Sequence, residues 1–242
     1  MENKLNYQPF DNLPGGYSSN DGTIDFYLRT NALINKNFTV LDFGAGRAGW
    51  YEDDKCETRK KVRYLKGKVN KLIAADVDEI VLQNKASDEQ ILITNKILGL
   101  EKDSVDLVIA DYVLEHIEDI DEFFSNVNYV LKDGGWFCAR TPHKYCYVVL
   151  ASKFIKDFLH SSLLNYIQPD RKTRDVFPAF YKLNTMRDIK RRFDGWENRS
   201  YIFKSDPAYY FGNKYIYKIQ QFLHTHLPAV FSGNLFIFLK KQ

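Results

Sequence analysis

The 242-residue sequence predicts a doubly wound α/β fold, in which a mostly parallel sheet of seven strands carries helices on both faces. Three observations lead to this prediction. Short apolar runs recur along the first 141 residues, a helical pattern separates the fourth run from the fifth, and closely spaced glycines follow the first run. We expect a single domain over residues 1–242, because a chain of this length can bury a full core.

The apolar runs indicate five strands in order. The first three are expected at residues 38–43, 71–76 and 90–94. Residues 104–113 are apolar almost without a break, which is typical of a central parallel strand covered on both faces. Residues 135–141 are expected to form the fifth strand.

A helix is predicted between the fourth and fifth strands. Gly134 stands just beyond it, where a left-handed C-terminal cap is expected. The apolar residues that recur at helical spacing are Ile120, Phe123, Phe124, Val127, Val130 and Leu131.

After residue 141 the alternation of strands and helices stops. Residues 142–194 are interpreted as an aromatic, partly helical insertion over the carboxyl edge of the sheet. Its aromatic residues, Tyr145 and Tyr147 among them, form either the core of the insertion or a face for a hydrophobic or sugar acceptor. Two final strands are predicted at 196–203 and 234–241, with a helix at 214–226 between them.

The composition argues against several classes of protein. The net charge of +3 is mild and gives no reason to expect a nucleic-acid partner. The cysteines Cys56, Cys138 and Cys146 show no metal-ligand spacing, so we expect reduced thiols in the cytoplasm and no metal site. The polar N-terminus shows no secretory signal, and no apolar run is long enough to span a membrane.

Two basic runs stand out, at residues 55–71 and 186–193. The ordinary interpretation of such runs is a solvated helix face. The alternative is a surface that meets phosphates, on a substrate or on a membrane. The sequence leaves both open.

The stretch "VLDFGAGRAGW", residues 40–50, ends the first strand in a glycine-rich loop. Ligands of open α/β sheets bind at the carboxyl ends of strands, and glycines let a ligand approach the backbone closely. Gly44, Gly46 and Gly49 formally match the dinucleotide fingerprint G-x-G-x-x-G. Asp42 stands two places before the first glycine, however, and the acid of the second strand lies farther along the chain than that fingerprint expects.

Four ordered motifs resemble those of class I S-adenosylmethionine-dependent methyltransferases. "VLDFGAGRA" resembles the first motif of the family, "AADVDE" the second-strand motif, "SVDLVIADYVLEHI" the fourth-strand motif, and "VLKDGGWFCARTPH" the turn and fifth strand. The similarity points to the type 11, UbiE/UbiG-like branch, and "YSSNDGTIDFY" with the insertion more loosely to a bacterial polysaccharide-associated subgroup. It implies a Rossmann-like sheet with one antiparallel strand and S-adenosyl-L-methionine as cofactor, leaving S-adenosyl-L-homocysteine as product.

The resemblance assigns cofactor roles to the first loop. Asp42 is expected to receive the ammonium group, although an aspartate there can also simply cap the following helix. Gly44, Ala45 and Gly46 are expected to pass under the methionine part and the ribose, and a side chain at Gly44 to fill space that the ligand needs. Ala48 stands where many relatives have a third glycine.

The resemblance also assigns residues to the adenosine end. Asp76, followed by Val77, is expected to accept the ribose hydroxyls, because an ionised carboxylate offers two acceptor oxygens. Asp78 is the competing candidate. Asn95 occupies the position at which relatives carry an acid beside the adenine amino group.

The fourth and fifth strands are expected to supply the remaining side chains. Asp111 and Tyr112 are expected to line the methionine side. His116 and His143 are the candidate catalytic bases, since histidine titrates near neutral pH and both follow central strands. His224 is expected to be a surface or core residue.

These observations predict a methyltransferase that methylates oxygen on a small molecule or a glycan- or lipid-linked intermediate. The alternatives are a quinone or small-metabolite O- or N-methyltransferase, and a cofactor-binding scaffold without chemistry. The sequence leaves the acceptor atom and the oligomeric state open.

Overall fold

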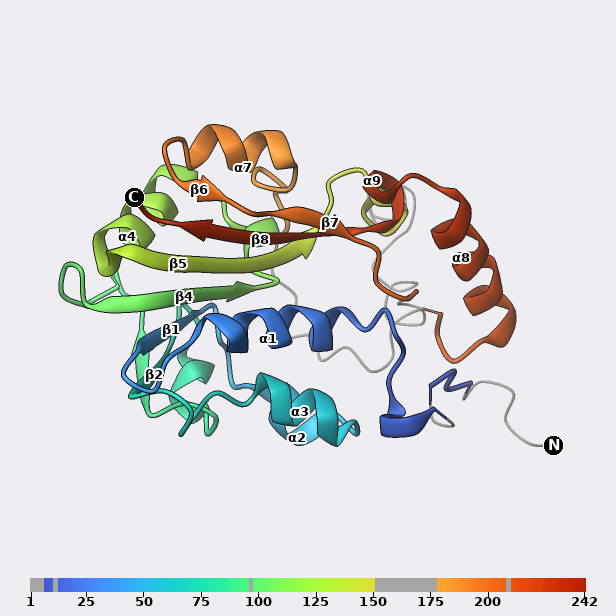
Figure 1. Ribbon diagram of the computed structural model, residues 1–242, viewed down its shortest axis with the longest axis horizontal. Helices are drawn as coiled ribbons and strands as arrows, with labels where there is room; N and C mark the ends of the chain where they lie inside the picture. The colour runs from blue at the N-terminus through green and yellow to red at the C-terminus, as the bar shows by residue number, and fades with distance from the viewer. Residues whose placement is uncertain (1–6, 11–12, 96–97, 151–177, 208–209) are drawn as a thin grey trace.

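The computed structural model describes residues 7–10, 13–95, 98–150, 178–207 and 210–242. Eight strands form one mixed sheet with helices on both faces (Figure 1). The strands are β1 Thr39–Phe43, β2 Lys71–Asp76, β3 Glu89–Leu92, β4 Val105–Asp111, β5 Leu131–Pro142, β6 Glu197–Asn198, β7 Tyr201–Phe203 and β8 Asn234–Lys240. The helices described are α1 Gly22–Leu33, α2 Gly49–Asp53, α3 Glu57–Arg63, α4 Ile120–Val130, α7 Met186–Arg192, α8 Lys214–His226 and α9 Ala229–Ser232, with 3₁₀ helices η1 Pro14–Gly16, η2 Glu79–Gln83 and η3 Leu114–His116.

The sheet has the strand order β3-β2-β1-β4-β5-β8-β6, and β7 also pairs with β8. The first five strands are parallel to one another, whereas β8 runs antiparallel to β5, β6 and β7. The mostly parallel, Rossmann-like arrangement expected from the sequence is therefore confirmed. The expected strand number is wrong, because the sheet has eight strands where seven were predicted.

Side-chain hydrogen bonds divide the strand predicted at 196–203 into β6 and β7. The Ser200 amide donates to Oδ1 of Asn198 at 2.9 Å, and the Phe238 amide donates to Oγ of Ser200 at 3.2 Å. These side-chain oxygens replace the backbone carbonyls of a regular ladder, so the strand is interrupted at Ser200.

Gly134 does not cap α4 as the sequence predicted. The helix ends at Val130, and Leu131 follows in extended backbone as the first residue of β5. Gly134 has a φ of +76° and lies in an irregular stretch of β5, where the pairing with β4 shifts between Leu131 and Trp136. The left-handed conformation of Gly134 therefore allows a β-bulge in β5.

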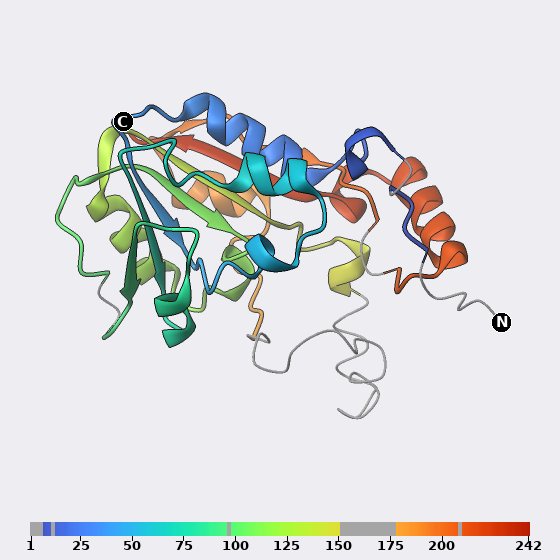
Figure 2. The same cartoon turned by 90° about the horizontal axis from the view of Figure 1, so that it is seen from below.

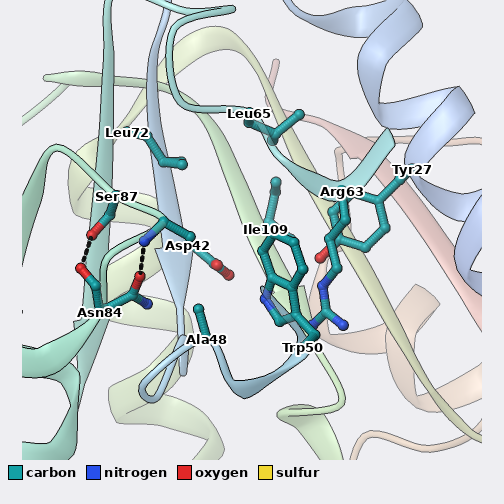
Figure 3. A pocket seen from close by; sticks show the side chains of 11 residues that line it. Tyr27, Asp42, Ala48, Trp50, Arg63, Leu65, Leu72, Asn84, Ser87 and Ile109 are labelled. Carbon is teal, nitrogen blue, oxygen red and sulfur yellow. Dashed lines mark hydrogen bonds between the residues drawn. The ribbon is translucent and has the colours of Figure 1, made fainter. Parts of the chain in front are cut away.

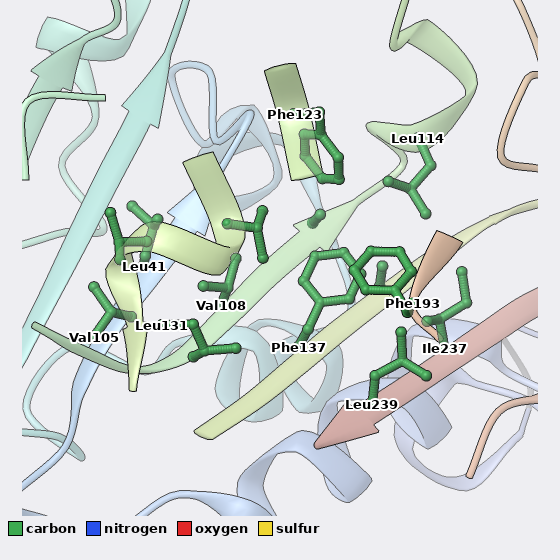
Figure 4. Packing of buried hydrophobic residues seen from close by; sticks show 14 of the residues in the cluster. Leu41, Val105, Val108, Leu114, Phe123, Leu131, Phe137, Phe193, Ile237 and Leu239 are labelled. Carbon is green, nitrogen blue, oxygen red and sulfur yellow. The ribbon is translucent and has the colours of Figure 1, made fainter. Parts of the chain in front are cut away.

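Helices from different parts of the chain cover the two faces of the sheet. Phe26 of α1 packs edge-on against Phe236 of β8, with ring centroids 5.6 Å apart. On the opposite face Phe123 of α4, Phe137 of β5 and Phe193 after α7 form a continuous aromatic cluster (Figure 4). Burial of each such ring stabilises the fold by about 1.5–3 kcal/mol.

The carboxyl ends of β1, β2, β4 and β5 share one edge of the sheet, because these strands are parallel. Pro142 at the end of β5 pairs with Asn234 at the start of β8. The connection from β7 to β8, which contains α8 and α9, therefore lies beyond this edge (Figures 1 and 2).

The predicted insertion at 142–194 is described at its two ends, and residues 151–177 lie outside the described residues. The predicted helix at 214–226 is found as α8 with the same bounds. No helix in the described part of the chain has the length and apolarity needed to cross a lipid bilayer.

Candidate functional site

Four charged side chains stand at the carboxyl ends of four neighbouring strands. They are Asp76 of β2, Asp42 of β1, Asp111 of β4 and Arg140 of β5. Side chains alternate between the faces of a sheet, so these four share the face of the apolar cluster under α1 and α3. The sequence predicted three of these positions as cofactor residues, and the strand order brings them together in one row, here called the polar row.

Asp42 lies in the middle of the polar row and lines a small cavity (Figure 3). Tyr27 of α1, Trp50 of α2 and Arg63 of α3 lie on the other side of this cavity. Burial raises the pKa of Asp42 to about 7, against the opposing charge of Arg63. This carboxyl therefore titrates near neutral pH, at a small cavity whose wall also contains Leu65, Leu72 and Ile109.

Asp111 is held by two guanidinium groups. Arg140 contacts it with two nitrogens, Nε 2.5 Å from Oδ1 and Nη2 3.0 Å from Oδ2, and both side chains are 4% exposed. Nη2 of Arg63 lies 3.1 Å from Oδ2, and Tyr27 donates its hydroxyl to the same oxygen at 3.1 Å. Burial raises the pKa of Asp111, but Arg140 and Arg63 outweigh this effect and hold the pKa below its ordinary value. Asp111 is therefore an ionised anchor of the polar row.

Among the residues that line this cavity, Arg63 is the basic side chain that comes from the run at 55–71. Its guanidinium stands 4.8 Å from the ring centre of Trp50 and 5.4 Å from that of Tyr27. Its Nε is buried and has no hydrogen-bond partner within the described ranges. The sequence assigned the whole basic run to a solvated face or a phosphate surface, and so missed this residue. One feature of the sequence could have indicated it. Arg59 and Arg63 are four residues apart and so lie on one side of a helix, and both form ion pairs in the structure.

The glycine loop folds back onto β2. The Gly44 amide donates to the carbonyl of Ala75 at 2.7 Å, and the Ala45 amide approaches the same oxygen at 3.3 Å. Gly44 and Gly46 both have positive φ, +74° and +49°. The loop is therefore tied to the second strand by its own backbone, and its two glycines adopt a conformation that other residues rarely take.

The two glycines are required for different physical reasons. A Cβ atom on Gly44 would lie 2.5 Å from Cγ2 of Val113, whereas one on Gly46 would have no heavy atom within 4 Å. The expectation that a side chain at Gly44 fills ligand space is wrong in its reason, because that side chain would meet Val113. Open space lies instead beside Gly46.

Asp76 joins the glycine loop to the end of the second strand. Its Oδ2 accepts from the Gly46 amide at 2.8 Å, and its Oδ1 accepts from the Asp78 amide at 3.1 Å. Oδ1 of Asp78 accepts from the Ile80 amide at 2.9 Å and caps η2. Asp78 thus has the capping role, and Asp76 stands beside the open backbone of the loop. Val77, next to it, is largely exposed.

Asn95 and Tyr112 follow the ends of β3 and β4 and are both exposed. Each has a positive φ, +51° for Asn95 and +58° for Tyr112. The Tyr112 ring lies against the guanidinium of Arg140, 4.7 Å from it. Tyr112 therefore adjoins the polar row, whereas Asn95 lies at the far side of β2.

The two predicted bases sit in different surroundings. Nδ1 of His116 lies 2.8 Å from the carbonyl oxygen of Pro178. His143 is buried, its Nδ1 accepts from the Tyr145 amide at 3.2 Å, and it also hydrogen bonds to the backbone of Val230. Burial lowers the pKa of His143. These contacts are those of a residue that holds the start of the insertion in place.

Two further candidate bases were missed in the sequence. Glu115 is buried and accepts the hydroxyl of Thr141 at 2.7 Å, and burial raises its pKa to about 7. The hydroxyl of Tyr147 lies 3.0 Å from Nε2 of His224, whose Nδ1 lies 2.7 Å from the carbonyl oxygen of Ser205. Only folding brings Tyr147 and His224 together, so no local pattern identifies this pair.

Comparison with known proteins identifies the fold. A family model described as a methyltransferase domain matches residues 55–139, a segment that begins after the glycine loop. No curated protein matches the chain. Within the described part of the chain, no three His, Cys, Asp or Glu side chains are placed to hold a metal ion.

Solved structures resemble the chain over nearly its whole length. YcgJ of Bacillus subtilis is 14% identical, with 91% of this chain and 98% of that chain covered and a TM-score of 0.51. A SAM-dependent methyltransferase of Aquifex aeolicus is 13% identical, with 89% and 88% covered and a TM-score of 0.50. Geranyl diphosphate C-methyltransferase of Streptomyces coelicolor A3(2), solved with Mg²⁺, geranyl diphosphate and S-adenosyl-L-homocysteine, is 13% identical, with 90% and 77% covered and a TM-score of 0.55.

The chain therefore has the Rossmann-like fold of class I methyltransferases. The family model that matches residues 55–139 is that of a methyltransferase domain, and the solved structures that share the fold include S-adenosylmethionine-dependent methyltransferases. At such low identities the structural likeness establishes the fold, and the acceptor has to be argued from the site.

Proposed function

We propose that this protein is an S-adenosylmethionine-dependent methyltransferase whose cofactor binds between the glycine loop and the polar row. The observation that carries this proposal is the 2.8 Å hydrogen bond from the Gly46 amide to Oδ2 of Asp76. It places a carboxylate that can accept ribose hydroxyls directly beside backbone with free space on its open side.

The residues around the small cavity suit the amino-acid end of this cofactor. Asp42 offers a carboxylate to an ammonium group, and Arg63 offers a guanidinium to a carboxylate. The buried Nε of Arg63, which has no partner in the described part of the chain, supports this assignment. A zwitterionic ligand end would meet complementary charges there.

Bound cofactor supplies a methyl group activated by a positive sulfur. The chain has to align the acceptor with that methyl and to remove a proton from a hydroxyl or amine acceptor. The Tyr147–His224 pair is our first candidate for this task, because the Tyr147 hydroxyl lies 3.0 Å from Nε2 of His224, whereas His143 is 4% exposed and hydrogen bonds to the backbone of Tyr145 and Val230. His116 and Glu115 remain further candidates.

The acceptor we propose is a small molecule or a glycan- or lipid-linked intermediate, methylated on oxygen. Exposed aromatic side chains at the carboxyl edge, Tyr112 and Tyr145 among them, support an acceptor with an apolar or sugar surface. The type 11, UbiE/UbiG-like and polysaccharide-associated branches are proposed on the motifs alone. A quinone or small-metabolite acceptor remains the alternative.

Calorimetric titration with S-adenosyl-L-homocysteine and with NAD tests the cofactor assignment. We expect binding of the former and none of the latter. Asp76→Ala should weaken binding by about 1–3 kcal/mol, the scale of a hydrogen bond to a charged group, whereas Asp78→Ala should not. Equal losses in both variants, or none in either, would remove Asp76 from the site. Binding without methyl transfer to any acceptor of a panel would favour the scaffold alternative.

A further inference from the structure

The helix α8 presents its apolar side outward. Tyr215, Ile219 and Phe222 are 78%, 62% and 60% exposed. Their spacing of four and three residues puts them on one side of the helix, here called the α8 stripe. Beyond the carboxyl edge of the sheet, α8 stands as the outermost helix of that end of the molecule (Figures 1 and 2).

The inner side of α8 already packs against other parts of the chain, so the α8 stripe is not the side of the helix that belongs to the protein core. Tyr217 is buried and packs against Tyr7 and Phe10, with ring centroids 5.6 and 6.1 Å apart. His224 bonds inward to Ser205, and Oε1 of Gln220 is buried without a partner within the described ranges. A helix that buries the side-chain oxygen of a glutamine and exposes isoleucine and phenylalanine has its apolar stripe directed toward something outside the chain.

Exposed apolar side chains are concentrated around this helix. Exposed large apolar residues cluster between positions 211 and 231: Phe211, Tyr215, Ile216, Ile219, Phe222 and Phe231. Single exposed apolar residues are ordinary on a protein surface, but a contiguous patch marks an interaction site.

The full charges on α8 itself are of one sign, and Asp206 is the acidic residue beside its inner side, at Tyr217 and His224. Lys214 and Lys218 lie on the exposed side of α8, and the sequence contains no Asp or Glu from residue 207 to residue 239. A partner complementary to this surface therefore offers an apolar region to the stripe and negative charge to the lysines.

We propose that the α8 stripe docks on an anionic lipid surface. A short helix with aromatic and aliphatic residues on one side and flanking lysines suits the boundary between acyl chains and headgroups. The lysine stems can lie along the apolar surface while their ammonium groups reach lipid phosphates, and the Tyr215 hydroxyl can stay in the headgroup layer. The helix spans about 20 Å at 1.5 Å per residue, so it lies on a membrane and does not cross it.

Docking would set the carboxyl edge of the sheet against the lipid. Nζ of Lys204, just after β7, donates to the carbonyls of His224 and Leu227 and fixes the end of α8 to the sheet. A lipid-linked acceptor would then be presented at the edge where the cofactor is proposed to bind. This last step rests on the proposed function, whereas the membrane contact does not.

Co-sedimentation with vesicles tests the proposal on the full chain. We expect binding to equimolar phosphatidylglycerol–phosphatidylcholine vesicles, much weaker binding to phosphatidylcholine alone, and a loss of binding at high salt. Ile219→Glu and Phe222→Glu should each abolish sedimentation with the vesicles. Lys214→Glu with Lys218→Glu should weaken binding on the order of tenfold or more without changing an apolar residue.

Tyr129→Glu is the matched control, because it adds the same charge at an exposed aromatic residue on α4. Circular dichroism and thermal melting establish that each variant folds, and titration with S-adenosyl-L-homocysteine reports on the cofactor site separately. Equal binding of wild-type protein and Phe222→Glu to anionic vesicles would overturn the proposal. A dimer in light scattering that Ile219→Glu dissociates, together with no vesicle binding, would assign the stripe to a second copy of the chain instead.

Discussion

The hydroxyl of Tyr147 lies 3.0 Å from Nε2 of His224. The other ring nitrogen of His224 lies 2.7 Å from the carbonyl of Ser205, which can only accept, so Nδ1 carries the proton and Nε2 accepts the hydrogen bond of the Tyr147 hydroxyl. Burial lowers the pKa of His224 and raises that of Tyr147, which keeps both groups neutral at pH 7. A neutral histidine with a fixed tautomer beside a phenol can pass a proton from an acceptor hydroxyl.

Tyr147→Phe is therefore expected to lower kcat by about 10²–10⁴-fold, the usual contribution of a general base, with little change in S-adenosyl-L-homocysteine affinity. His224→Gln should behave in the same way. Tyr129→Phe is the control, because Tyr129 is an exposed tyrosine on α4 and does not belong to the pair. Single-turnover rates over pH 6–9 measure the effect. Full activity of Tyr147→Phe alongside an inactive His116→Ala would transfer the role to His116.

Substitutions at the two glycines should separate stability from binding. Gly44→Ala is expected to lower the free energy of unfolding by about 2–5 kcal/mol, because the new methyl group meets Val113 and the residue also takes the left-handed strain. Gly46→Ala should cost only about 1–2 kcal/mol of left-handed strain and should weaken cofactor binding, because its methyl group enters open space. Urea denaturation and calorimetry on both variants check this contrast. A Gly46→Ala protein with unchanged affinity would place the ligand elsewhere.

Cofactor binding should weaken as the pH falls below neutrality. The pKa of Asp42 is about 7 in the free protein, and an ammonium group pairs with the ionised carboxylate. Below pH 7 the Kd of S-adenosyl-L-homocysteine should therefore rise, approaching tenfold per pH unit. Asp42→Asn should bind weakly at every pH and lose this dependence. A wild-type affinity that stays constant from pH 8 to pH 5 would contradict the role of Asp42.

Stability should show the opposite dependence on pH. The pKa values of Asp42 and Glu115 are both raised to about 7 by burial, from ordinary values near 4. The folded protein thus holds these protons more tightly, so their contribution is fully present below about pH 4 and is lost as the pH rises through 7. Asp42→Asn should flatten the fall in the free energy of unfolding between about pH 4 and 7. Urea melts at several pH values measure it.

Breaking the ion pair of the polar row should be costly. Arg140→Met leaves the buried Asp111 with one guanidinium fewer, and we expect a loss of about 3–5 kcal/mol in the free energy of unfolding. Arg29→Met breaks the exposed pair with Asp25 and should cost about 0–1 kcal/mol. Asp111→Asn in the Arg140→Met background should recover part of the loss. An effect of Arg140→Met as small as that of Arg29→Met would show that the pair is not a structural anchor.

The sequence was sufficient for the parts of the fold that depend on local pattern. The strand ending at Asp76 and the helix at Lys214–His226 were predicted with the observed bounds, because apolar periodicity and end signals act over a few residues. The division at Ser200 was not predicted, because it depends on a hydroxyl that bonds to a residue of β8.

For the candidate site, too, the sequence indicated only the residues that belong to local motifs. Asp42, Asp76 and Asp111 were recognised because each ends a strand in an ordered motif. Arg63 was missed because a basic run gives no indication of which of its residues turns inward. The burial of His143 and the pairing of Tyr147 with His224 depend on contacts between distant segments, which no pattern within one segment records.

The interruption at Ser200 also affects how copies of this protein behave toward one another. β6 and β7 at one edge of the sheet have two and three residues, and β3 at the other edge has four. An incoming strand adds to an edge by matching a long row of free amides and carbonyls. Neither edge offers such a row, so crowded molecules should resist joining sheet to sheet, even though the strands between these edges are strongly apolar.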